Sequence, residues 1–76
     1  MNDVRRKEIN KAIDLLRQAQ SILEDCRDDE QEYIDNMPEN LQSSDRYYTA
    51  EDAINSLEEA IDSIDSAADQ AEESLG

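Results

Sequence analysis

The stretch from Tyr47 to Leu75, YYTAEDAINSLEEAIDSIDSAADQAEESL, repeats its apolar side chains every seven residues. With Ile54 at heptad position a, positions a, d and g are apolar throughout except at Ser74. They are Tyr47, Ile54, Ile61, Ala68 and Leu75 at a, Ala50, Leu57, Ile64 and Ala71 at d, and Ala53, Ala60 and Ala67 at g. This repeat is typical of an α-helix with one buried face. The alanines at g leave room for a neighbouring helix to approach closely.

The residues before Ile54 offer two starts for this helix. Thr49-Ala-Glu-Asp52 has the spacing of a capping box, in which the threonine side chain caps the first turn. Ser44 is a rival start. We assign the helix to residues 49–75 and a turn to residues 37–48, in which Pro38–Leu41 can form one helical turn. We expect Leu41 to cover the open end of the apolar layer.

The first half of the chain repeats the pattern less strictly. With Ile9 at a, the a and d positions are apolar from Ile9 to Met37 except at Glu30. Further apolar residues at e and g widen the stripe to about half of the helix circumference: Ile13, Leu15, Ile22 and Ile34. Asn2 or Asp3 can cap the start. We predict a helix over residues 3–36, because the residue before Pro38 disfavours the helical conformation.

These two segments predict an all-α fold, a single domain over residues 1–76 that forms an antiparallel, coiled-coil-like two-helix hairpin. A chain of 76 residues rarely builds a core worth more than about 3–5 kcal/mol without a disulfide, a metal or a partner subunit. Cys26 is the only cysteine and histidine is absent. The wide stripe on the first helix also exceeds what one neighbour can cover. We therefore expect a homodimer that forms a four-helix bundle.

Charge is the strongest feature of the composition. Twenty-one Asp and Glu against seven Lys and Arg give a net charge of −14. Residues 1–27 carry six basic and five acidic side chains, whereas residues 28–76 carry sixteen acidic side chains and Arg46 alone. Such a surface repels nucleic acid and anionic membranes and attracts basic protein surfaces. No run of apolar residues is long enough for a membrane span, and no signal peptide is recognisable. We expect a cytoplasmic location, where a lone cysteine stays reduced.

The residue inventory argues against an enzyme, a metal site or a cofactor. Without histidine there is no Ser-His or Cys-His pair, and the single glycine, Gly76, cannot build a phosphate-binding loop. No calcium-binding loop motif occurs, and Asp28-Asp29-Glu30 is more simply part of a helix surface. Cys26 falls at d, where we expect a buried, unreactive thiol.

The second helix carries an acidic stripe without a single intervening cation from Tyr47 onward. Its nine carboxylates occupy positions b, e and f: Glu51, Asp52, Glu58, Glu59, Asp62, Asp65, Asp69, Glu72 and Glu73. They span about 33 Å of helix, a mean spacing of ~3.7 Å per charge against ~3.4 Å per phosphate in one DNA strand. This face is either a phosphate-mimicking, partner-binding surface or simply solvated surface. In the second case Arg27 and Arg6 could pair with Glu58 and Glu72. Tyr48 is expected to be exposed and to add a contact, with Tyr47 in the core.

Two stretches, residues 27–46 and 53–62, resemble a group of small acidic proteins encoded by phages and prophages. The most distinctive part is the turn Asp35-Asn-Met-Pro-Glu-Asn-Leu-Gln42, which follows a long helix and precedes an acidic one. The resemblance implies a phage origin and a location in the bacterial cytoplasm. In charge and architecture the chain is also similar to the acidic coiled-coil inhibitors by which phages block host nucleases and CRISPR effectors. Arg5, Arg6 and Lys7 depart from a uniformly acidic mimic.

Two functional hypotheses follow. In the first, the protein is an inhibitor that binds a basic, nucleic-acid-binding surface of a host or defence protein by phosphate mimicry. In the second, it is a structural or adaptor module that docks through its apolar stripe, for example at Leu16 and Ile22, while the acidic residues keep it in solution.

Overall fold

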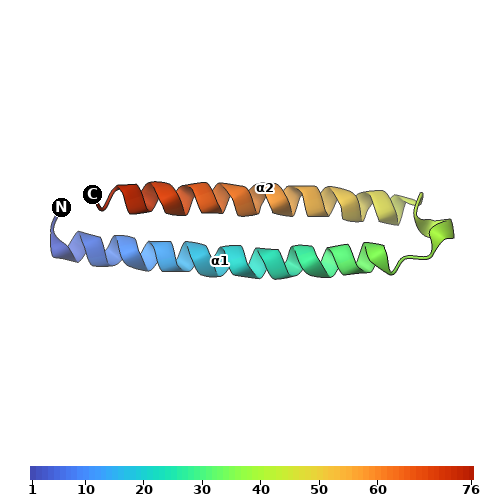
Figure 1. The fold of residues 1–76 in the computed structure, drawn as a ribbon, viewed down its shortest axis with the longest axis horizontal. Helices are drawn as coiled ribbons and strands as arrows, with labels where there is room; N and C mark the ends of the chain where they lie inside the picture. Colours follow the sequence, from blue (N-terminus) through green and yellow to red (C-terminus); the bar gives the residue numbers. More distant parts are fainter.

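The computed structural model describes all 76 residues as two long helices joined by a short turn (Figure 1). Helix α1 spans Asp3–Asp35, the 3-10 helix η1 spans Glu39–Leu41, and α2 spans Asp45–Glu73. The helices run antiparallel, side by side along their whole length, and both chain ends lie at the same end of the rod. The molecule measures 60 × 14 × 13 Å between its Cα extremes. The predicted all-α hairpin is confirmed.

The ends of α1 follow the sequence signals closely. The Asn2 side chain accepts a hydrogen bond from the backbone N–H of Arg5 at 2.8 Å and is the N-cap. The helix ends at Asp35, one residue before the predicted end, because the residue before Pro38 must leave the helical region. The predicted turn at Pro38–Leu41 forms as η1, with Pro38 as its N-cap.

Helix α2 begins four residues before Thr49, so the predicted start at the capping box is wrong. Ser44 is the N-cap instead, and its hydroxyl accepts a hydrogen bond from the backbone N–H of Tyr47. The same hydroxyl donates to the backbone carbonyl of Leu41, which ties the helix start to η1. The Ser44 hydroxyl thereby bonds both the free N–H of Tyr47 in the first turn of α2 and the carbonyl of Leu41. Because the helix has already begun at Asp45, Thr49 lies inside it. The helix ends at Glu73, two residues before the predicted end.

The core is a thin line of side chains between the helices. Ile34, Ala50 and Ile54 form a buried cluster near the turn, with Tyr47 packed against it. Towards the chain ends the buried residues are Ile13, Ile61 and Ala68. Met37 covers the turn end of this core, whereas Leu41, which we expected there, is 41% exposed. The backbone N–H of Met37 donates to the carbonyl of Ile34 at 3.0 Å and so keeps Met37 against the end of α1, whereas Leu41 follows Pro38 in η1.

Helix α1 uses only part of its wide apolar stripe against α2. Its buried residues Ile13 and Ile34 lie at heptad position e, and Ile9, Leu16 and Leu23 at a are half-buried. The g positions face outward, so that Leu15 and Ile22 are 56% and 62% exposed, and the d positions lie at the edge of the contact with α2. The prediction that one helix cannot cover the whole stripe is confirmed. Neither helix carries an apolar stretch that could cross a membrane.

Candidate functional site

The acidic stripe of α2 covers the outer side of α2 and one edge of its contact with α1. Heptad positions a and d of α2 supply most of its side of the core, so positions b, e and f are left at its surface. Of the nine predicted carboxylates, Glu51 is half-buried and the other eight are exposed. Tyr48 lies on the same side at position b and is 54% exposed, whereas Tyr47 is half-buried, as predicted. The two tyrosine rings meet edge to face, with centroids 5.7 Å apart.

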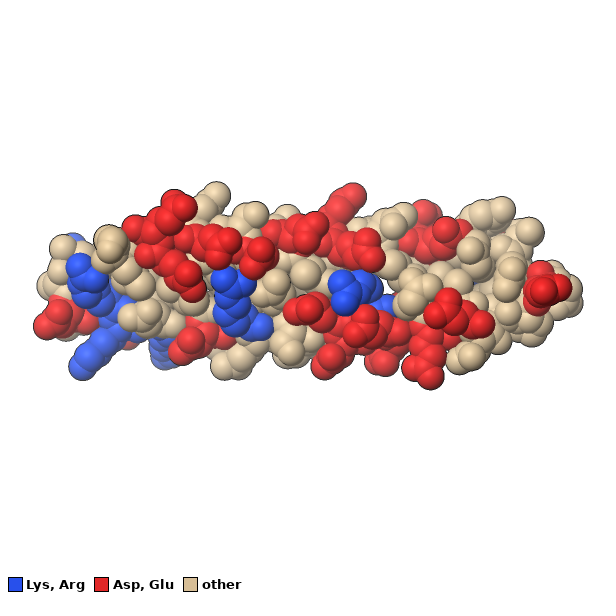
Figure 2. Space-filling model, in the orientation of Figure 1, with Lys and Arg blue, Asp and Glu red and all other residues tan.

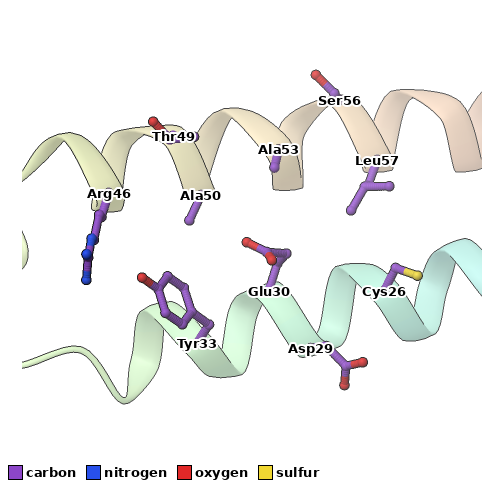
Figure 3. Close-up of a pocket in the computed structure, with 10 residues that line it drawn as sticks. All are labelled: Cys26, Asp29, Glu30, Tyr33, Arg46, Thr49, Ala50, Ala53, Ser56 and Leu57. Carbon is purple, nitrogen blue, oxygen red and sulfur yellow. The ribbon is translucent and has the colours of Figure 1, made fainter.

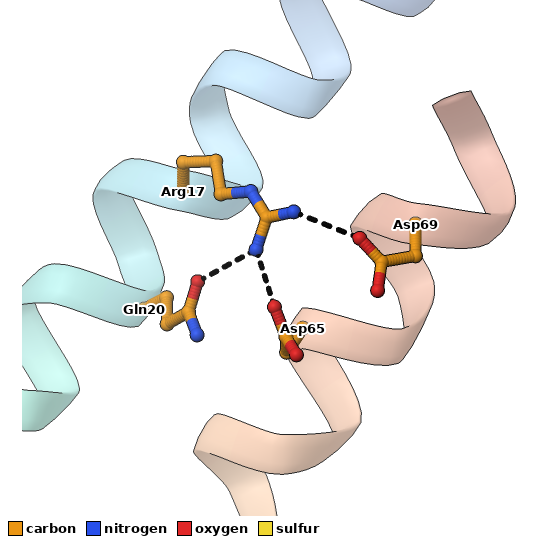
Figure 4. A network of polar contacts seen from close by, with 4 residues as sticks. All are labelled: Arg17, Gln20, Asp65 and Asp69. Atoms are coloured by element: carbon orange, nitrogen blue, oxygen red, sulfur yellow. Dashed lines mark hydrogen bonds and ion pairs between the residues drawn. The ribbon is translucent and has the colours of Figure 1, made fainter.

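Two carboxylates of the stripe form ion pairs with Arg17 of α1 (Figure 4). The Arg17 guanidinium donates from Nη1 to Asp65 at 2.6 Å and from Nη2 to Asp69 at 3.0 Å. Nη1 also donates to the side-chain oxygen of Gln20 at 3.1 Å. The hydrogen bond to Asp65, supported by the one to Asp69, raises the pKa of Arg17 above its ordinary value. Arg17 thus clamps α1 to α2 on the acidic side of the hairpin.

The ion pairs expected from the heptad positions do not form. Arg27 pairs with its neighbour Asp28, not with Glu58. Arg6 donates to the backbone carbonyl of Leu75 at 2.7 Å, not to Glu72. A neighbouring carboxylate and an unpaired helix-terminal carbonyl are closer partners for these arginines than the opposite e positions. Seven of the nine carboxylates of the stripe therefore carry no ion pair.

The net charge is divided very unequally along the rod (Figure 2). The midpoint of the hairpin falls near residue 20 of α1 and residue 63 of α2. We call residues 20–63 the loop half, and residues 1–19 with 64–76 the terminal half. The loop half holds fourteen acidic side chains against two arginines, a net charge of −12. The terminal half holds seven acidic against five basic side chains, a net charge of −2.

This division gives the loop half a charge density close to that of nucleic acid. Half of the 60 Å rod is about 30 Å, so one net negative charge falls on every ~2.5 Å of length. The corresponding values are ~3.4 Å for one DNA strand and ~1.7 Å for the duplex. Carboxylates of α1 contribute as much as those of α2, namely Glu24, Asp25, Asp28, Asp29, Glu30, Glu32 and Asp35. The sequence-based prediction placed the acidic surface on α2 alone and so missed this half of it.

A second face of the hairpin carries mostly uncharged side chains, with Asp29, Glu30 and Arg46 as charged residues near the turn. An open groove of about 850 Å³ lies between the helices near the turn, lined by Tyr33, Ala50, Ala53 and Leu57 among others (Figure 3). Glu30, the break in the predicted stripe, points into this groove, and Asp29 and Arg46 also line it.

From this groove the face continues along both helices to the terminal half, and we call it the uncharged face. On α2 it consists of positions c, d and g: Thr49, Ala50, Ala53, Ser56, Leu57, Ala60, Ser63, Ile64, Ala67, Gln70 and Ala71. On α1 it consists of the apolar d and g positions: Ala12, Leu15, Ala19, Ile22, Cys26 and Tyr33. The c positions of α2 are all Ser, Thr or Gln. This run of uncharged residues beside the apolar d and g positions is the feature of the sequence from which the uncharged face could have been predicted.

Cys26 lies on this face and is exposed, so the prediction of a buried thiol is wrong for the single chain. The cause is the rotation of α1 that buries position e, because position d then lies at the edge of the helix contact, beside the groove, where it stays open to solvent. No group of three or more acidic or cysteine side chains is arranged to hold a metal ion. Comparison of the chain with protein-family models, with curated proteins and with solved structures gives no match.

Proposed function

We propose that this protein is a small, non-catalytic, phage-type inhibitor that occupies a basic, nucleic-acid-binding surface of a host or defence protein in the bacterial cytoplasm. The observation that carries the proposal is the net charge of −12 on about 30 Å of rigid helical rod. A basic groove that accepts a nucleic-acid strand meets a similar linear charge density here. The resemblance to small acidic phage proteins agrees with this role.

Within this proposal the carboxylates of the stripe have different tasks. Those of the loop half, including Glu51, Asp52, Glu58, Glu59 and Asp62, are exposed or half-exposed and have no ion pair. They are the contacts that we propose for the target, together with Tyr48 as an amphipathic anchor.

The remaining four carboxylates lie in the terminal half. There Asp65 and Asp69 hold Arg17, and Glu72 and Glu73 share their end of the rod with basic residues of α1. We propose that these four contribute long-range attraction and no close contact.

The test is a comparison of two charge-reversal variants with equal net charge. Glu58, Glu59 and Asp62 are changed to Lys in one, and Asp3, Glu72 and Glu73 in the other, so each gains six charge units. Neither set touches the Arg17 clamp. The immobilised proteins capture partners from bacterial lysate at low salt, and elution is followed with rising salt and with added duplex DNA.

Mimicry predicts that the parent captures a nucleic-acid-binding protein that either salt or duplex DNA releases. The loop-half variant should lose this capture, and the terminal-half variant should keep most of it. Equal capture by both variants, or a captured protein that duplex DNA does not release, would refute the proposal.

We also propose that the protein acts as a homodimer in a four-helix bundle. Its accessible surface of 5616 Å² exceeds by roughly 900 Å² the ~4,700 Å² expected for a globular monomer of 8.7 kDa. A standard protein interface covers about 800 Å² on each partner. Exposed Leu15 and Ile22 on α1 lie where a second pair of helices would bury them.

The exposed uncharged face also supports the alternative function, an adaptor that docks by apolar contacts on a different protein. Changing Ile22 to Asp separates the two functions. An adaptor would lose its partner through this change and would bind almost independently of salt. A charge mimic would keep its target, and only its self-association would weaken.

A further inference from the structure

On the α2 part of the uncharged face the d positions follow the order small, large, large, small, and this order is centred between Ala60 and Ile61, within one residue of the central alanine at g. Seven residues to each side of Ala60 stand Ala53 and Ala67, and the d positions around them are Ala50, Leu57, Ile64 and Ala71. The c positions nearest the centre are both serine, at Ser56 and Ser63. In a two-fold interface the same patch of both subunits meets itself. When the axis is perpendicular to the helices, the chain direction is reversed, so each residue must fit the residue at the corresponding position on the other side of the centre. Two antiparallel copies of α2 meet this condition when they cross at Ala60.

The register of the hairpin fixes where the same two-fold axis meets α1. Cys26 lies opposite Leu57, and Tyr33 lies opposite Ala50 (Figure 3). Continued along the helices, this register brings Ala60 level with Leu23, and the centre of the α2 d positions, between Ala60 and Ile61, level with the peptide bond between Ile22 and Leu23. Antiparallel stacking about this level places the large Tyr33 of one copy over the small Ala12 of the other. It also directs exposed Leu15 towards the partner's groove beside Glu30.

The charges select the antiparallel arrangement over the parallel one. Parallel stacking of two hairpins would superimpose two loop halves with a net charge of −12 each. Antiparallel stacking places the terminal half, with Arg5, Lys7 and Lys11, along the loop half of the other copy. The carboxylates of α2 do not oppose this, because positions b, e and f point away from the uncharged face.

We infer that the uncharged face is covered by a second copy of this chain, antiparallel to the first, with α1 on α1 and α2 on α2 and the two-fold axis at Ala60. The face is about 32 Å long, from Ala50 to Ala71, and about 18 Å wide across two packed helices. These dimensions suit an interface of standard size. The inference rests on the proposed homodimer and is independent of the proposed inhibition.

One engineered cysteine tests this geometry. In the variant Ala60→Cys with Cys26→Ser, the introduced thiol lies on the two-fold axis, where the alanine-lined crossing allows the short Cα separation that a disulfide needs. The matched control, Asn55→Cys with Cys26→Ser, places its thiol on the opposite, exposed side of α2. Each variant is oxidised alone and in a mixture with the parent chain, which retains Cys26. Solution mass is measured by sedimentation, and folding by circular dichroism.

The inference predicts a mass twice that of the 8.7 kDa chain for the parent. It also predicts disulfide-linked dimers of the Ala60→Cys variant alone, and none with the Asn55 control. A link that forms only in the mixture, between Cys26 and the introduced thiol, would show α1 stacked on α2 in a parallel dimer and would overturn the inference. A monomeric mass, or a dimer that the Ala60→Cys variant does not link, would overturn it as well. No target or nucleic acid enters the assay, so its outcome does not depend on the proposed inhibition.

Discussion

Truncation of two isoleucines tests how the apolar residues are divided between the core of the hairpin and its outer face. Ile54 is 7% exposed in the buried cluster, and Ile22 is 62% exposed on α1. Both lie inside helices, so Ile→Ala changes the intrinsic helix propensity equally in the two variants. The comparison therefore isolates burial.

The structure gives different magnitudes for the two changes. Ile54→Ala should cost about 2–4 kcal/mol, because it removes buried methyl groups and leaves a cavity. That is most of the roughly 3–5 kcal/mol that a core of this size supplies. In a single hairpin Ile22→Ala should cost less than about 1 kcal/mol, since most of its side chain already meets water. If a second copy covers Ile22, its cost should approach that of Ile54 and should grow with protein concentration.

Urea unfolding followed by far-UV circular dichroism, at two protein concentrations, measures both values. The expected result is a large loss for Ile54→Ala at either concentration, and a loss for Ile22→Ala that depends on concentration. A negligible loss for Ile54→Ala would refute the helix register described here. A loss for Ile22→Ala that is as large as that of Ile54→Ala and independent of concentration would show that the single chain packs α1 through a different face.

Four further substitutions test the start of α2, the Arg17 ion pairs and the turn by the same unfolding measurement. Ser44→Ala should cost about 1 kcal/mol of unfolding free energy as a lost N-cap, whereas Thr49→Ala should cost almost nothing. A larger loss for Thr49→Ala than for Ser44→Ala would show that α2 begins at the capping box. Arg17→Gln should lower the urea midpoint at low salt and not at high salt, where the surface ion pairs are screened; a loss that persists at high salt would point to packing by the arginine stem. Met37→Ala should cost about 2 kcal/mol or more, because Met37 is only 8% exposed beneath the turn; an unchanged midpoint would show that the turn end frays.

The heptad pattern predicted the two helices, their antiparallel pairing and the line of core residues from Ile54 to Ala68. It did so because burial on a helix depends on a period that a single sequence displays directly. It also indicated that α1 is too apolar for one neighbour. It could not show which side of the wide stripe faces α2, since large apolar residues occur at a, d, e and g alike. Cys26 was therefore predicted to be buried and is exposed.

The errors at the turn and in the ion pairs have a different origin. Ser44 and Thr49 both satisfy the rules for a helix start, and the contact of the Ser44 hydroxyl with Leu41 decides between them. That contact depends on η1, a tertiary detail that no local rule contains. Similarly, the reach of Arg17 to Asp65 and Asp69 depends on the stagger of the helices. A single residue of stagger changes which charges meet.

Both lysines of the chain, Lys7 and Lys11, lie on α1 in the terminal half. Amine-reactive dyes, biotin esters and activated surfaces therefore attach only there, and the carboxylate-rich end, up to 60 Å away, remains unmodified. A sensor chip prepared by ordinary amine coupling would carry the molecules in one orientation, with the loop half towards the solution.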